Sequence, residues 1–269
     1  MSERGEPLAE NELVIIRDPE GRKYLRRLRP GGQLVLKDGK VEFDRLVGLP
    51  PGAEILTSTG QTLLVHRPSA RDYIMKMKRK SNIIYPKELG IILVWADIFA
   101  GARVMTAGVG SGALVVGLLR IMGESGWLFG YDVRDDMLQF ARDNIREFYG
   151  RLPTNVVLRQ VDVYESVPDL QLDRVILDLP EPWLALDALV EPLVPGGLLL
   201  CYLPTITQVE RLQRELEAHH AYWYLETLEI LLRRWRVCSP SVRPEHQMVG
   251  HTGFLVLAQR AQRSCPKEG

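Results

Sequence analysis

The chain has little of what marks a secreted, membrane-spanning or metal-binding protein. Its three cysteines lie far apart and form no Cys-x-x-Cys pair, which excludes a disulfide framework and favours a reducing, cytoplasmic location. No apolar run approaches the ~20 residues that cross a bilayer, and the first residues are polar and acidic, so neither a membrane anchor nor an export signal is expected. The five histidines lack metal-ligand spacing, and no metal site is expected.

An excess of charge of either sign is also absent. Lys and Arg together number 34, as do Asp and Glu, so no global field attracts a nucleic acid or a membrane surface. A polyanionic partner must therefore use a local patch. The most basic stretch of the first 68 residues contains Arg22, Lys23, Arg26, Arg27 and Arg29. The favoured interpretation of these residues is a solvated face, and the alternative is a nucleic-acid patch.

The apolar pattern divides the 269 residues into three parts. Residues 1–68 carry short alternating runs between turns rich in Pro and Gly, which predicts a small β-domain resembling a barrel. Residues 69–102 predict a helical linker in which Pro86 opens a helix. Residues 103–269 alternate apolar strands with amphipathic helices, which predicts an α/β domain with a doubly wound parallel sheet covered on both faces.

The expected elements of this third part can be placed by their residue ranges. The pattern predicts strands at 103–107, 127–131, 156–160, 174–177, 197–202, about 222–232 and 253–259. It predicts helices from Ser111 onward and at 135–149, 183–190 and 207–218.

A glycine-rich loop joins the first of these strands to the first helix. Gly108, Gly110 and Gly112, with Ser111, Ala113 and Leu114, give the chain a backbone that can approach a ligand closely. The same residues satisfy the dinucleotide fingerprint, so a nicotinamide or flavin enzyme is a competing interpretation. A third interpretation is that these glycines form a tight turn that binds no ligand.

Two acidic residues follow the next strands. Asp132 ends its strand where a carboxylate accepts hydrogen bonds from both hydroxyls of a ribose. Asp162 is placed to accept a hydrogen bond from the exocyclic amine of an adenine ring, or else is a solvated loop residue. A dehydrogenase would also need a proton-transfer group facing the nicotinamide, and no convincing candidate exists.

A third acidic residue, Asp178, opens the segment Asp178-Leu179-Pro180-Glu181-Pro182-Trp183 after the fourth strand. A carboxylate at this edge can hydrogen-bond an amine, orient a ring nitrogen toward an activated methyl group and take up the proton that methylation makes acidic. Taken in isolation, an Asp that caps the following helix is the favoured interpretation.

Five motifs in order resemble tRNA adenosine-58 N1-methyltransferases, a branch of the class I methyltransferases with a Rossmann-like fold. The resemblance covers nearly the whole chain and is carried by Tyr85-Pro86-Lys87, Ala107 to Gly112, Leu177 to Trp183, Tyr202 to Gln208, and Arg243 to His246 with Gly250 to Leu255.

The resemblance implies a function and a set of site residues. Asp178 would engage the target adenine and Tyr85 would help to seat the extruded base. S-adenosylmethionine would lie on Gly108, Gly110 to Leu114, Asp132, Met137, Asp162 and Asp178. The partner would be tRNA, bound across a homotetramer, and the candidate phosphate contacts are Lys76, Lys78, Arg79, Lys80, Arg233, Arg234, Arg236 and Arg243.

The chain departs from the family pattern at two positions. Thr106 stands where a Glu is usual, which puts one contact to the methionine end of the cofactor in doubt, and Glu88 replaces an Asp. Two alternatives follow: a methyltransferase that acts on another amine, and a non-catalytic tRNA-binding paralogue.

Overall fold

The computed structural model describes residues 5–262, which fall into two compact units. The first unit contains the chain up to Lys78 together with Asn144–Arg151, and the second contains Arg79–Asp143 and the chain from Leu152 onward. Cys265 lies outside the described residues. Within the described range, no helix is both long and apolar enough to cross a membrane.

The first unit is built on antiparallel strands. Its four-stranded sheet has the order β2-β1-β6-β5, and β3 and β4 form a separate hairpin; the bounds are β1 (Leu13–Arg17), β2 (Lys23–Arg27), β3 (Gln33–Leu36), β4 (Gly39–Glu42), β5 (Ala53–Leu56) and β6 (Thr62–His66). Both sheets contribute to one core, in which Val14, Ile16, Leu34 and Val41 are buried. A short 3-10 helix, η1 (Phe43–Arg45), also belongs to this unit.

Helix α1 (Ala70–Lys76) closes the first unit and begins with a capping box. The Ser69 hydroxyl accepts from the backbone N–H of Asp72, and the Asp72 carboxylate accepts from the backbone N–H of Ser69. Tyr73 is fully buried, and its hydroxyl donates to the carbonyl of Asn144 at 2.7 Å. This bond ties α1 to the end of helix α4 (Asp135–Tyr149), because Asn144–Arg151 belongs to the same unit.

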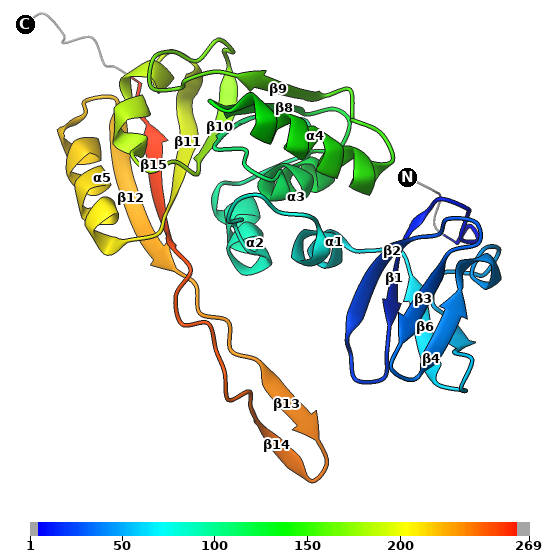
Figure 1. Cartoon of the computed structure of the whole chain (residues 1–269). Coiled ribbons are helices and arrows are strands. Elements are labelled where there is room, and N and C mark those ends of the chain that lie inside the picture. The colour runs from blue at the N-terminus through cyan, green and yellow to red at the C-terminus, as the bar shows by residue number, and fades with distance from the viewer. Residues whose placement is uncertain (1–4, 263–269) are drawn as a thin grey trace, which may run out of the picture. The chain divides into compact units, whose positions relative to one another are not determined.

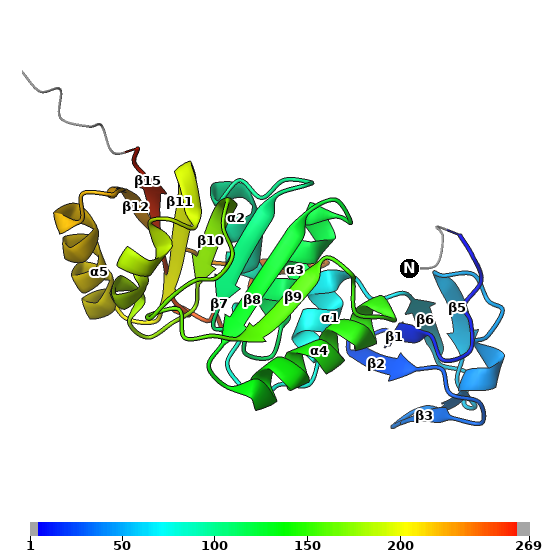
Figure 2. The same cartoon turned by 90° about the horizontal axis from the view of Figure 1, so that it is seen from above.

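The second unit is built on a seven-stranded sheet with the order β12-β15-β11-β10-β7-β8-β9 (Figures 1 and 2). The strands are β7 (Arg103–Ala107), β8 (Trp127–Asp132), β9 (Val156–Gln160), β10 (Leu172–Leu177), β11 (Leu193–Leu203), β12 (Tyr222–Glu229) and β15 (Phe254–Arg260). The helices are α2 (Pro86–Trp95), α3 (Ala113–Met122), the first part of α4 up to Asp143, and α5 (Ile206–Ala218). The predicted doubly wound α/β architecture is confirmed, except that β15 runs antiparallel to both of its neighbours.

Both faces of this sheet are buried, as its apolar strands predicted. Met105 and Ala107 on β7 pack into a core cluster with residues of β10, β11 and α5. The alternate residues Val104 and Thr106 point to the opposite face and are also fully buried. Covered faces leave the strand ends as the place where side chains can meet a ligand.

The segment between β10 and β11 differs from the expected helix at 183–190. It forms two consecutive 3-10 turns, η2 (Pro182–Ala185) and η3 (Asp187–Leu189). Pro182 stands in the first turn and Pro192 follows the last, so few residues remain between the two prolines for α-helical hydrogen bonds. The amphipathic pattern was correct, but the chain winds more tightly than an α-helix.

The expected strand at about 222–232 is shorter, because β12 ends at Glu229. Beyond it a long arm leaves the sheet and ends in an unforeseen hairpin of β13 (Trp235–Cys238) and β14 (Ser241–Pro244), as Figure 1 shows. The arm returns to β15, where Glu229 and Phe254 are paired neighbours. Residues 230–253, called the arm below, are therefore an insertion between two paired strands.

Candidate active site

The sheet register brings the predicted site residues to one edge. Leu177 of β10 pairs with Ala107 of β7, and Ala107 pairs with Tyr131 of β8. The next residue on each strand is therefore Asp178, Gly108 and Asp132, all at the carboxyl ends of parallel strands. The order of the strands reverses between β7 and β10, and such a switch point is where open α/β sheets bind ligands.

The glycine loop has a backbone that side chains would disturb. Gly108, Gly110 and Gly112 have φ of 80°, 52° and 85°, in the left-handed region. A Cβ on Gly108 would collide with the Asp178 carbonyl, and one on Gly110 would lie 2.7 Å from the Ser81 hydroxyl. The glycines thus permit close contacts within the protein as well as any approach of a ligand.

Helix α3 begins directly after this loop. Gly112 is its N-cap and provides no side-chain acceptor, so the first backbone N–H groups of the helix, from Ala113 and Leu114 onward, have no side-chain cap. Their partial positive charge suits an acceptor group of a ligand. The side chains of both residues are buried, so any contact to a cofactor goes through the backbone.

The side chain of Ser111 forms hydrogen bonds within the protein. Its hydroxyl accepts from the backbone N–H groups of Lys80 and Ser81, at 3.1 and 3.3 Å, and lies 3.2 Å from the Ser81 hydroxyl. Ser111 therefore anchors the segment before α2 to the glycine loop. Any contribution of Ser111 to a cofactor would come from its backbone.

Asp132 is buried and already holds the loop. One carboxylate oxygen accepts from Gly110 N–H at 3.1 Å, and the other accepts from Arg134 N–H at 3.1 Å. Each oxygen has a second lone pair, so the carboxylate keeps acceptor capacity for ribose hydroxyls. Asp162 is exposed beyond the end of β9 and accepts from Tyr164 N–H at 2.9 Å. Met137 is buried in the first half of α4.

Asp178 is partly buried, and its carboxylate lies among packed protein atoms. Desolvation, and secondarily the charge of Asp132, raise its pKa to about 7. It does not cap the following helix: Glu181 is the N-cap of η2, and the described residues provide no hydrogen-bond partner for the Asp178 carboxylate. The helix-cap interpretation of Asp178 is therefore wrong.

Tyr202 opens one of the motifs that carry the family resemblance, but the sequence did not predict it as a site residue. It follows Cys201, which pairs with Leu177, so it stands beside Asp178 on the neighbouring strand. Burial raises the pKa of Tyr202 to about 12, and the charges of Glu88, Asp178 and Tyr85 contribute. Its hydroxyl donates to the Thr252 carbonyl at 2.6 Å. A tyrosine at the end of a buried strand was the available signal.

Tyr85 is the N-cap of α2 and is 37% exposed, so its ring is open to a ligand. The Arg79 guanidinium lies 5.8 Å from the centre of that ring. The charges of Asp178 and Tyr85 both help to raise the pKa of Tyr202, so each of the two predicted catalytic residues lies within electrostatic range of it.

A buried ion pair lies next to Tyr85. Lys87 contacts the carboxylate of Glu88, which is fully buried, and donates to the Ile230 carbonyl and the Thr252 hydroxyl at 2.7 Å each. Thr252 also donates to Glu88. Ile230 and Thr252 belong to the two legs of the arm, so this pair joins the start of α2 to the base of the arm.

His251 also joins the arm to the edge of the site. Its two ring nitrogens lie 2.7 Å from a carboxylate oxygen of Glu229 and from the Pro204 carbonyl. Two acceptors suit a protonated ring, and these bonds raise the pKa of His251.

Thr106 is fully buried on β7, directly before the glycine loop. Its hydroxyl has no hydrogen-bond partner among the described residues. A buried hydroxyl without a partner is costly, and a polar ligand at the glycine loop would be a suitable partner. With the uncapped α3 terminus and the spare lone pairs of Asp132, these donors and acceptors fit a cofactor that has a ribose and a charged amino-acid end.

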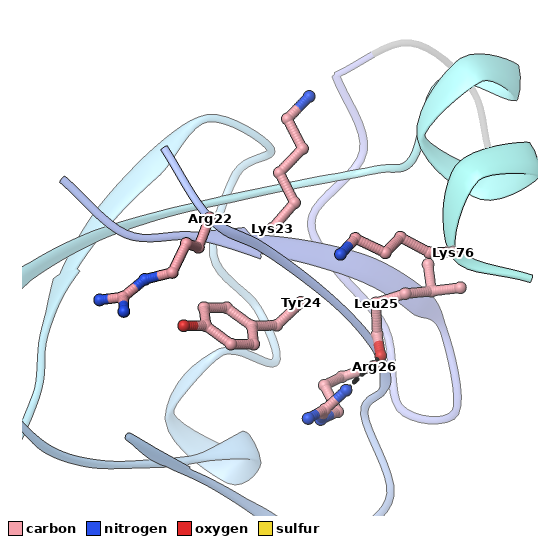
Figure 3. Close-up of a pocket in the computed structure, with 6 residues that line it drawn as sticks. All are labelled: Arg22, Lys23, Tyr24, Leu25, Arg26 and Lys76. Atoms are coloured by element: carbon pink, nitrogen blue, oxygen red, sulfur yellow. Dashed lines mark hydrogen bonds between the residues drawn. The ribbon is translucent and has the colours of Figure 1, made fainter. Parts of the chain in front are cut away.

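Four basic residues of the first unit, Arg22, Lys23, Arg26 and Lys76, line a pocket of about 330 Å³ together with Tyr24 and Leu25. Figure 3 shows Lys76, from α1, with the residues of β2 and Arg22 around it. Two of its four basic side chains are paired with carboxylates, Arg22 with Asp18 at 2.6 Å and Lys23 with Asp72 at 2.5 Å. Within the second unit, Arg233, Arg234 and Arg236 are exposed on the arm.

No group of three His, Cys, Asp or Glu side chains in the described part of the chain is arranged to hold a metal ion.

The chain is similar to known tRNA methyltransferases. The family model described as "tRNA methyltransferase complex GCD14 subunit" matches residues 63–243. The tRNA (adenine(58)-N(1))-methyltransferase TrmI of Thermus thermophilus is 37% identical over 93% of this chain and 98% of its own length.

Two solved structures are similar over most of the chain. The tRNA (m1A58) methyltransferase TrmI of Aquifex aeolicus is 32% identical, with a TM-score of 0.84 over 96% of this chain and all of its own. A protein of Thermotoga maritima described as a SAM-dependent O-methyltransferase is 30% identical, with a TM-score of 0.89 over 96% of each chain.

Proposed function

The chain belongs to the GCD14 family of tRNA methyltransferases, and from that premise we propose that it transfers a methyl group from S-adenosylmethionine to N1 of adenosine 58 in the T-loop of tRNA. Residues 103–269 are the methyltransferase domain in this proposal, 1–68 a small β-domain, and 69–102 the linker. A tRNA substrate agrees with the cytoplasmic location that the sequence favours.

The observation that carries the proposal is the Asp178 carboxylate at the switch point of the sheet, beside the glycine loop and without a hydrogen-bond partner among the described residues. S-adenosylmethionine supplies a methyl group already activated by its sulfonium, so the protein needs mainly to place the acceptor. Asp178 accepts a hydrogen bond from the exocyclic amine of adenine, which turns N1 toward the methyl group.

The charge balance of the transfer agrees with an acidic group at this position. The N1 lone pair forms the new bond to carbon, the bond to sulfur breaks, and the positive charge moves to the adenine ring. The exocyclic amine then becomes more acidic. A carboxylate with a pKa of about 7 can stabilise this charge and accept the proton.

The cofactor would lie across the ends of β7, β8 and β9. Asp132 would hold the ribose hydroxyls, Asp162 the exocyclic amine of the adenine, and Met137 would line the ring. The residues of 108–114 would contribute backbone N–H groups. The buried Thr106 hydroxyl would face the methionine end in place of the usual Glu.

The target base has to leave its stack, because N1 of an adenine engaged in pairing is not accessible. The exposed ring of Tyr85 is a surface on which an extruded base can stack, with Arg79 close to it. Phosphates would be held by the exposed basic side chains around residues 76–80 and on the arm.

A homotetramer that binds tRNA across its subunits is part of the proposal. Its support in this chain is the arm, which presents Trp235, Val237 and Val242 at more than half of their full exposure. Light scattering of the purified chain gives the oligomeric state directly. A monomer at micromolar concentration would contradict this part of the proposal.

The decisive experiment is methylation of a mixed tRNA pool with labelled cofactor, followed by mapping of the modified base. The expected product is 1-methyladenosine at position 58, absent when adenosine 58 is replaced. Methylation of another amine, or of a hydroxyl as in the description of the Thermotoga relative, would overturn the assignment of the acceptor.

Asp178→Ala is the matched variant for this assay. It should retain binding of S-adenosylmethionine in calorimetry and lose at least about a hundredfold in methyl transfer, the scale of a positioned acid or base. Transfer at the wild-type rate would contradict the role of Asp178. Binding of tRNA without any binding of cofactor would instead favour the non-catalytic paralogue.

A further inference from the structure

The loop after Asp178 has few backbone hydrogen bonds of its own. Pro180 and Pro182 have no N–H to donate. Asp178 itself is anchored from the sheet, since its N–H donates to the Ala107 carbonyl at 2.9 Å. Downstream of this bond, the position of the loop depends on side chains from elsewhere.

Helix α5 supplies the first of these side chains. The side-chain amide of Gln208 donates to the Pro180 carbonyl at 2.9 Å. The Thr205 hydroxyl donates to the Gln208 side-chain oxygen at 2.6 Å, which orients the amide. Thr205 is also the N-cap of α5 and accepts from the Gln208 N–H. The contact to Pro180 therefore starts from a rigid helix terminus.

Arg211, one turn further along α5, is the second side chain that contacts the loop after Asp178. Its guanidinium lies 4.3 Å from the centre of the Trp183 ring, within cation–π distance. The same group lies 3.8 Å from the carboxylate of Glu181. A planar guanidinium on an indole face fixes both side chains.

Tyr164, in the connection between β9 and β10, supplies the third contact. Its hydroxyl accepts from the Glu181 N–H at 3.3 Å. The loop is thus held at Pro180, Glu181 and Trp183. All three positions are contacted from α5, and Tyr164 holds Glu181 in addition.

We propose that Gln208 and Arg211 form a clamp that positions the Asp178 loop for methyl transfer. This inference rests on the proposed function. Neither residue needs to contact the substrate, so both are positioning residues that act through Asp178. The clamp keeps the carboxylate aimed at the base by restraining the loop downstream of the bond between Asp178 N–H and the Ala107 carbonyl.

The test is single-turnover methylation of tRNA by Gln208→Ala and Arg211→Met. Each should lower the rate about tenfold, because small misplacements of a reacting group are costly. The affinities for S-adenosylmethionine and tRNA should stay within about twofold of wild type. Gln208→Glu should lose more, since its carboxylate would face the Pro180 carbonyl without a proton to donate.

Matched controls lie on the same helix. Gln213 makes an exposed bond to Glu217, and Arg214 is exposed, so Gln213→Ala and Arg214→Met should keep the wild-type rate. Circular dichroism and thermal unfolding establish that all variants fold. A clamp variant that keeps its melting temperature but loses rate supports positioning, and an unchanged rate overturns it.

Two further measurements distinguish a role in positioning Asp178 from a general loss of stability. A loosened loop hydrates Asp178 and lowers its pKa from about 7, so the acidic limb of the rate profile should move to lower pH in Gln208→Ala. In an Asp178→Ala background, Gln208→Ala should cause no further loss, because the clamp acts through Asp178. Additive losses would overturn the proposal.

An Arg211 variant could instead raise the KM for tRNA and reduce the salt dependence of binding by about one counterion. That result would identify Arg211 as a phosphate contact and overturn its place in the clamp. If the wild-type protein does not methylate adenosine 58, the proposed function is wrong. If the wild type methylates adenosine 58 and Gln208→Ala does so at the same rate, only the proposed clamp is wrong.

Discussion

Gly108 and Asp178 are in backbone contact across the switch point of the sheet, so closely that a Cβ on Gly108 would collide with the carbonyl of Asp178. The first glycine of the cofactor loop and the residue assigned to the acceptor are thus one structural unit. A change at either position should affect both halves of the site.

The first prediction follows from this contact. Gly108→Ala should destabilise the second unit by at least about 2 kcal/mol and abolish cofactor binding, because φ of 80° and the Asp178 carbonyl both oppose a side chain. Gly123→Ala is the matched control, since Gly123 has φ of 66° but open space around its Cβ position. Urea unfolding measures both. Equal losses would show that the φ angle alone is responsible.

A second prediction concerns pH. The folded-state pKa of Asp178, about 7, lies above its ordinary value of 3.8. Between these values the folded state binds more protons than the unfolded state, so this group lowers stability as pH rises from about 4 to 7 and has a constant effect above 7. Asp178→Asn removes the ionisation. This variant should be as stable as the wild type at pH 4. At pH 8 its free energy of unfolding should exceed that of the wild type by about 1–2 kcal/mol, after allowance for solvent screening.

The same group predicts the pH dependence of the reaction. If the ionised carboxylate is the active form, the rate of a single turnover should rise with pH and level off above about 7. A rate that is flat between pH 5 and 8 would argue against a titrating Asp178. Thermal melts of the free tRNA at each pH control for changes in the substrate.

Thr106 offers a third prediction. Thr106→Val keeps the shape of the side chain and removes a buried hydroxyl that has no partner among the described residues. The free protein should be as stable as wild type or slightly more stable, and the dissociation constant for S-adenosylmethionine should rise about five- to tenfold. Unchanged cofactor affinity would show that the hydroxyl is not used. Thr106→Glu, which restores the usual residue, is the complementary variant.

The buried pair of Lys87 and Glu88 gives a fourth. Lys87→Met should cost about 3–5 kcal/mol, because it leaves the fully buried Glu88 carboxylate without its cation. The double variant Lys87→Met/Glu88→Leu should recover part of that loss. Lys80→Met, in the exposed pair with Asp136, should cost less than about 1 kcal/mol. A double variant as unstable as the single one would mean that hydrogen bonds to the arm matter more than the charge.

The sequence predicted the sheet well where apolar pattern and turn chemistry agree. The strands 103–107 and 156–160 match their observed bounds, and the position of Asp178 at a strand end was correct. The expected helix at 183–190 shows the limit, because hydrophobic periodicity does not separate an α-helix from consecutive 3-10 turns between two prolines.

The contacts around the site were less accessible to prediction. That the Ser111 hydroxyl holds Lys80 and Ser81, and that Gln208 reaches Pro180, are relations between segments far apart in the chain. A linear pattern gives the residue type and the element, but side-chain partners across elements depend on register and packing. Tyr202 was missed for this reason, although the strand that carries it was placed correctly.

The pairing of Glu229 with Phe254 makes the arm a separable module. A two-residue turn is the usual connection between antiparallel neighbours, so a chain in which such a turn replaces the outer part of the arm should keep its sheet. This shortened chain would allow substrate recognition to be grafted or exchanged without rebuilding the catalytic edge. The described pairing of β12 with β15 also lies entirely outside residues 232–249, so an insertion in that segment does not interrupt the pairing.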